Sequence, residues 1–311
     1  MVSIVSQPHV ARHEEAQSFR SAPRSWVGAV LLVSVALQLT GAFLRYQTIQ
    51  PARLSGLPSE RARSFSFSYF DVLDGGRPVF FLSLALIAVL GSAVALRPNR
   101  VRGALVGGFC ASMVGTTLYL TLYSTDAPKS VHFGPGFLII LAGLAIEGCV
   151  AAWILVAVVS SPPDHASIGR SGIGLALTTA FVVGASTETT DLKFVHGQPL
   201  ALFTPLSFKS GAAALVAFVA VAAVPLLAAR VRGRVGSAIV VGLAAYEATR
   251  VVDVLDQRFV WPGLSPAQVT IGWWIEILAV ALLVAMAMRL APHKQAPIPS
   301  LAARERPNLV T

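Results

Sequence analysis

Four ionisable side chains lie inside long apolar runs of the sequence: Glu147, Glu247, Arg250 and Glu276. An ionisable residue at membrane depth is rare and costly, so each is a candidate for function. Two of the glutamates end the same pattern, a glycine followed by three apolar residues and glutamate. On a helix this glycine lies one turn before the carboxylate on the same face. It leaves room there for a partner helix, a water or a small solute, and the four residues form a candidate intramembrane polar site.

The repeated glutamates, Glu147 and Glu276, have two interpretations. In the first, they are protonatable carboxylates at matching depths that face each other and line a pathway for a small solute or ion. In the second, each is neutral or hydrogen-bonded inside a helix bundle and only fixes the register of neighbouring helices. The sequence leaves both interpretations open.

A second group of charges occupies one later segment. Glu247, Arg250 and Asp253 follow one another at three-residue spacing, which places them on one face of a helix. This face could be a specialised site, or Glu247 and Arg250 could neutralise each other and hold the helix in place. Arg250 is also the natural partner for Glu276 on the following segment.

Two similar loop motifs follow apolar segments in different parts of the chain. Their marked residues are Arg45, Tyr46, Gln50 and Pro51 in the first motif and Lys193, Phe194, Gln198 and Pro199 in the second. An aromatic residue beside a base is typical of an anchor at the membrane–water interface. The alternative is a surface that recognises lipid headgroups or a partner protein. The aromatic-rich segments 65–74 and 200–208 are expected to be interfacial or re-entrant.

Signatures of catalysis and of metal binding are missing from the sequence. His132 and His196 fall in different loops, and Cys110 and Cys149 lie in apolar runs, where we expect them to be small packing residues. No phosphate-binding loop or nucleophile elbow is present, and we expect no cofactor and no metal. Solvated loop charge is the simpler explanation for the acids that gather in the predicted outer loops, which could otherwise bind a cation or act as acid and base: Asp71, Asp74, Asp126, Glu188, Asp191, Asp253 and Asp256.

The composition indicates the environment of the segments that hold these candidate residues. Of the 311 residues, 55% are hydrophobic and only 13% charged, about half the roughly 25% charge of soluble domains. This excludes a water-soluble enzyme, a disordered chain and a disulfide-stapled secreted module. The net charge of +9 is scattered over short loops, which argues against nucleic-acid binding and leaves the lipid bilayer as the expected environment. The mostly arginine basic residues are typical of a GC-rich, bacterial genome.

Apolar runs that could cross a bilayer, which takes about 20 residues, occur eight times. The predicted spans are 26–44, 79–96, 103–123, 137–159, 172–187, 211–229, 236–253 and 269–290. The span 172–187 is the weakest, because it is short and rich in threonine and glycine. Lysine and arginine concentrate in both tails and in the turns 97–102 and 230–234. This bias predicts cytoplasmic N- and C-termini in the cell membrane.

The sequence also has the marks of a duplication. The two loop motifs are offset by 148 residues, the two arginine turns by 133, and the two glycine–glutamate patterns by 129. Each half has an even number of spans, so the halves would be parallel repeats about an axis along the membrane normal. We therefore predict an all-α polytopic membrane bundle of two four-helix repeats. Its parts are a cytoplasmic tail at 1–25, a first repeat at 26–159, a linker at 160–171, a second repeat at 172–290 and a tail at 291–311.

Three function classes fit the sequence. The first is a carrier of a small solute or ion, favoured by parallel duplication and by the paired intramembrane glutamates. The second is a non-catalytic subunit or scaffold of a cell-envelope assembly with membrane-protein partners, favoured by helix faces of small residues and by a core with few polar groups. The third is an outer-face enzyme acting on lipid-linked substrates. It rests only on the loop acids and histidines, so we rank it last.

Overall fold

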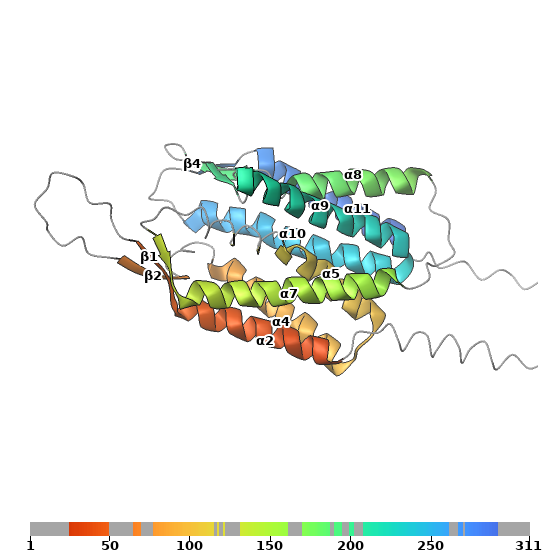
Figure 1. Ribbon diagram of the computed structural model, residues 1–311. Helices are drawn as coiled ribbons and strands as arrows, with labels where there is room; N and C mark the ends of the chain where they lie inside the picture. The colour runs from red at the N-terminus through yellow and green to blue at the C-terminus, as the bar shows by residue number, and fades with distance from the viewer. Residues whose placement is uncertain are drawn as a thin grey trace, which may run out of the picture.

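A bundle of helices with short strands at one end makes up the computed structural model (Figure 1). The structure describes residues 25–49, 65–69, 77–114, 117, 121, 131–160, 170–186, 190–194, 199–201, 208–260, 267–269 and 271–291. Within these ranges it contains eight long helices and six short strands.

Each of the eight predicted spans overlaps one of the helices. Their bounds are α2 Ser25–Phe43, α4 Arg77–Leu96, α5 Arg100–Ala111, α7 Pro135–Val159, α8 Arg170–Ser186, α9 Phe208–Val231, α10 Gly233–Val260 and α11 Ile271–Leu290. The span predicted at 103–123 is described only in part, as α5 and the helical residues that follow it to Val114 and at Thr117 and Thr121.

Several of these helices are suited to a bilayer. Four are long and apolar enough to cross it: α2, most of α7, the Gly233–Val252 part of α10, and α11. Three more contain shorter apolar stretches, at Phe80–Leu96, Ser171–Ser186 and Leu215–Val231. The chain is therefore a helical membrane protein, while eight crossings stay a prediction.

Two small antiparallel sheets add to the helical architecture. In the first, β1 (Arg45–Ile49) lies between β2 (Phe65–Ser68) and β3 (Val131–Phe133). In the second, β4 (Thr190–Phe194) lies between β5 (Pro199–Ala201) and β6 (Ala267–Val269). Interfacial loops were predicted from the sequence where β1 and β4 lie. Strand pairing gives hydrogen-bond partners to backbone groups that would otherwise lack them where the chain leaves a helix.

The bundle has two distinct ends (Figure 1). The sheets lie at one end, while the α4–α5 and α9–α10 turns, the start of α2 and the end of α11 lie at the other. In the first turn, Oδ1 of Asn99 accepts a hydrogen bond of 2.7 Å from the backbone N–H of Arg102 and so caps α5. The second turn passes through Arg232 and Gly233, which have φ angles of 59° and 57°. The arginine-rich turns and both described chain ends therefore share one side.

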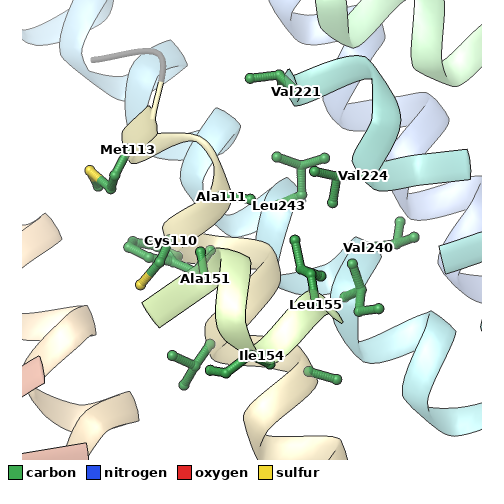
Figure 2. Close-up of a cluster of buried hydrophobic side chains, with 14 of the residues drawn as sticks. Cys110, Ala111, Met113, Ala151, Ile154, Leu155, Val221, Val224, Val240 and Leu243 are labelled. Atoms are coloured by element: carbon green, nitrogen blue, oxygen red, sulfur yellow. The ribbon is translucent and has the colours of Figure 1, made fainter. Parts of the chain in front are cut away.

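The helices pack in two groups. Helix α2 packs against α4 and α7, and α7 packs against α5. Likewise α8 packs against α9 and α11, and α11 packs against α10. Helices α5 and α10 join the two groups. Figure 2 shows buried apolar side chains from α5, α7, α9 and α10 meeting there, among them Cys110, Ile154, Val224 and Leu243.

The contact between α5 and α10 depends on two glycines. A Cβ atom added at Gly108 would lie 2.0 Å from the backbone oxygen of Ile239. One added at Gly242 would lie 2.0 Å from the backbone oxygen of Leu105. Neither position can accept a side chain without moving a helix, so the two backbones touch directly at this crossing.

Candidate functional site

Glu147 lies on α7, on the face that packs against α2. The glycine one turn earlier, Gly143, permits this approach, because its Cβ would lie 2.6 Å from Cγ of Gln38 and 3.0 Å from the backbone oxygen of Ser34. The space that the glycine leaves beside the glutamate is therefore occupied by a partner helix. A partner helix was one of the three occupants considered from the sequence.

The carboxylate of Glu147 has unequal oxygens. Its Oε1 accepts hydrogen bonds from the hydroxyl of Ser34 at 2.8 Å and from Nε2 of Gln38 at 2.5 Å. The same hydroxyl lies 2.7 Å from the backbone oxygen of Leu31, and its one hydrogen serves only one acceptor at a time. Oε2 is buried and has no hydrogen-bond partner within the described part of the chain. The side chain is 0% exposed, so half of this carboxyl group is desolvated without compensation.

Arg250 on α10 is the centre of a second polar cluster. Its guanidinium forms ion pairs with Glu247 on the same helix, at 3.3 Å, and with Glu276 on α11. It also donates a hydrogen bond of 3.2 Å to the backbone oxygen of Ser186 at the end of α8. The Ser186 hydroxyl lies 3.5 Å from Oε2 of Glu247. Both glutamates are 0% exposed and Arg250 is 9% exposed. Three helices thus share a buried group with two carboxylates and one cation.

The structure brings some of the candidate residues together and separates others. The Glu247–Arg250 pair, one of two alternatives considered from the sequence, and the Arg250–Glu276 pair are both present. Glu147, by contrast, takes its hydrogen bonds from α2, which belongs to the same packing group as its own helix α7. The two repeated glutamates therefore belong to two clusters with different partners.

Three polar residues that the sequence analysis did not single out complete the clusters: Ser34, Gln38 and Ser186. A signal for them exists, because Ser34 and Gln38 are polar, four residues apart and inside an apolar helix, hence on one face. The offset of 148 between the loop motifs also carries position 38 onto position 186. The sequence does not show which helix each of these polar faces packs against.

The first outer motif is partly described, and its aromatic residue is inside the protein. Tyr46 is only 3% exposed and packs its ring against Tyr69 and Phe137, with ring centroids 4.9 and 5.4 Å apart. It therefore does not face lipid as an interfacial anchor would. Arg45 is exposed at the start of β1. Gln50 and Pro51 lie outside the described residues.

The second outer motif is described for its backbone only. Lys193 and Phe194 belong to β4, where they pair with Gln268 and Ala267 of β6. Lys193 also pairs with Pro199 of β5. Gln198 lies outside the described residues.

The remaining candidates are described only in part. Cys110 is buried and Cys149 is exposed, and both are free thiols. His132 lies on β3, while His196 lies outside the described residues. Within the described ranges, no group of three or more histidine, cysteine, aspartate or glutamate residues could hold a metal ion. Most of the outer acids noted in the sequence fall in segments that are not described.

Comparisons of the chain with protein-family models, with curated proteins and with solved structures found no match. The two buried clusters are thus the features from which a function can be argued. One combines carboxylates with a fixed cation, and the other has a single carboxylate with neutral donors.

Proposed function

We propose that the chain is a carrier of a small solute or ion, built as two parallel four-helix repeats with eight membrane crossings. The bilayer would be the cell membrane, with both termini on the cytoplasmic side. The shared side of the arginine turns and of both described chain ends supports this orientation.

The order of elements supports the duplication. Among the described elements of each half, a helix is followed by two strands, two helices, one strand and a final helix. In each half the first strand is the middle strand of the sheet and pairs with the other two. Two unrelated halves would have no reason to share this order and this pairing. An axis along the membrane normal would then pass near the α5–α10 crossing, since these two helices occupy the same place in their halves.

One observation favours a carrier over a purely structural protein. Glu147 is fully buried in a bundle suited to a bilayer, yet its Oε2 lacks a hydrogen-bond partner in the described structure. A glutamate that served only to fix helix register would gain most from full hydrogen bonding. A carboxyl oxygen kept free instead can accept a proton or another cation and release it again, as coupled carriers require.

A flux measurement tests the carrier function. Wild-type protein is reconstituted into liposomes that contain a pH-sensitive dye and is challenged with alkali cations, ammonium, amino acids and sugars. We expect at least one of these to move, and we expect Glu147→Gln and Glu276→Gln each to abolish the movement while remaining folded. Cys149→Ser, an exposed change on the same helix as Glu147, is the matched control and should transport normally. A wild-type protein that moves nothing in the panel, or two glutamine variants with normal flux, contradicts the carrier proposal.

A non-catalytic membrane subunit is the second candidate, favoured by the complete burial of all three intramembrane glutamates. Such burial suits charges that hold helices in place for a partner protein. Purification in a mild detergent distinguishes the two. A subunit would carry a stoichiometric partner with it, whereas a monodisperse chain without a partner contradicts this second candidate.

A further inference from the structure

We propose that the Glu147 cluster is a binding site for a small monovalent cation, and that Arg250 is a built-in cation that occupies the corresponding site of the second half. The inference rests on the proposed function, because it uses the duplication and specifies what the carrier binds. It assigns the two clusters different tasks: one exchanges its cation, and the other keeps it.

The correspondence between the clusters follows from three offsets in the chain. The offset of 129 relates Glu147 to Glu276, and the offset of 148 relates Gln38 to Ser186. In each half, therefore, a polar side chain from the first helix lies at the cluster that contains the glutamate. The offset of 133 relates Thr117 to Arg250. Where the second half carries a guanidinium, the first half carries a threonine.

Thr117 does not replace the cation. Its hydroxyl donates a hydrogen bond of 2.7 Å to the backbone oxygen of Met113 on its own helix, so that hydrogen is already committed. The same helix face packs against α7 beside the glutamate, because Cγ2 of Val114 lies 3.3 Å from the position of a Cβ on Gly148. The helix that would supply a cation to Glu147 is therefore in place, but the described residues on its face carry no positive charge.

The charge and the burial of the Glu147 cluster determine which class of ligand it can bind. Its described donors, Ser34 and Gln38, are neutral and both bind Oε1. One carboxylate, with one oxygen that has no partner among the described residues, matches a single positive charge, and a divalent ion would leave an uncompensated charge in the bundle. Because Glu147 is 0% exposed, only a small ion can enter without unfolding the helices. Ammonium, which donates hydrogen bonds, and Na⁺, which takes oxygen ligands, are the two probes.

Thermal stability in detergent measures this binding without any transport. Ammonium chloride or sodium chloride replaces N-methylglucamine chloride at constant ionic strength. A ligand that binds only the folded state raises Tm in proportion to the logarithm of its concentration once its site is saturated. We expect such a rise for wild type with at least one probe, its loss in Glu147→Gln, and its retention in Cys149→Ser. No rise in wild type, or the same rise in Glu147→Gln, overturns the proposal.

Two exchanges of residue test the role assigned to Arg250. Thr117→Arg supplies a tethered cation to the first cluster, so the variant should lose its response to the probe salt. Arg250→Thr removes the tethered cation from the second cluster, so its lower Tm should rise with millimolar guanidinium, and more than that of wild type. A Thr117→Arg variant with an unchanged salt response, or an Arg250→Thr variant that guanidinium does not rescue, contradicts this role. If neither variant folds, the comparison of wild type with Glu147→Gln still decides the binding site.

The outcomes separate this inference from the proposed function. Flux in liposomes without a cation-dependent Tm would support the carrier function and contradict the cation-binding site at Glu147. The opposite result is a cation-dependent Tm that needs Glu147, without flux of any solute in the panel. It would support the cation-binding site and contradict the carrier function.

Discussion

The α5–α10 crossing predicts a large penalty for the smallest possible change, Gly108→Ala. The new Cβ would lie 2.0 Å from the backbone oxygen of Ile239 and 2.8 Å from its carbonyl carbon. Ordinary contact begins at 3.4 Å, so the shortfall to the oxygen is 3.4 − 2.0 = 1.4 Å. Both atoms belong to the helix backbone and not to a movable side chain. The helices must therefore separate, and the buried side chains around the crossing must lose contact.

The size of the penalty follows from two opposing effects. Overpacking in a close-packed interior costs about 1–3 kcal/mol, and a clash with backbone belongs in the upper part of that range. Alanine in a helix gains about 1 kcal/mol over glycine. We therefore expect Gly108→Ala to lower the free energy of unfolding by about 1–2 kcal/mol. Gly174→Ala on α8, where nothing lies within 4 Å of the new Cβ, should be neutral or gain up to about 1 kcal/mol.

Reversible unfolding in mixed detergent micelles, followed by far-UV circular dichroism, measures both variants. The expected gap between them is about 1–3 kcal/mol, from the sum of the two effects. Gly242→Ala probes the same crossing from the other helix, because its Cβ would lie 2.0 Å from the oxygen of Leu105, and it should resemble Gly108→Ala. If Gly108→Ala and Gly174→Ala are equally stable, the backbones do not touch at this crossing.

Three further changes test other parts of the structure by the same unfolding measurement. Gly143→Ala should push α2 from α7, since the new Cβ would lie 2.6 Å from Cγ of Gln38. After the helix gain of alanine, a loss of about 1–2 kcal/mol is expected, and unchanged stability would mean that α2 does not pack there. Arg250→Met leaves the carboxylates of two helices without their shared cation and should cost about 3–5 kcal/mol; a loss below about 1 kcal/mol would contradict the buried ion pairs. Asn99→Ala removes the cap of α5 and should cost about 0.5–2 kcal/mol, whereas Asn99→Asp, which keeps the acceptor, should cost less; equal losses would exclude the cap.

The helical framework was predictable because it depends on local patterns. Apolar runs placed a helix in every expected span, and the basic turns marked one end of the bundle. The Arg250–Glu276 ion pair was predictable for a similar reason. A buried cation needs an anion, and Glu276 was the ionisable group available on the next apolar segment.

Other parts depend on contacts between distant segments, which no local pattern records. Ser34 and Gln38 were visible as polar residues in an apolar helix, but only the packing of α2 on α7 gives them Glu147 as a partner. The expectation that the ring of Tyr46 faces lipid was wrong for the same reason. An aromatic residue beside a base has the same local sequence whether its ring meets lipid or, as here, Tyr69 and Phe137.

The two sheets impose an order of assembly on the newly made chain. Strand β1 can pair with β2 as soon as the segment between them is complete, but its pairing with β3 must wait until α4 and α5 have been synthesised. The same delay separates β4 from β6, which follows α9 and α10. Such long-range pairing is slow to form. Each half would thus pass through an intermediate with an open strand edge, and closure of that edge by the third strand would mark the moment when its last helix is ready to dock.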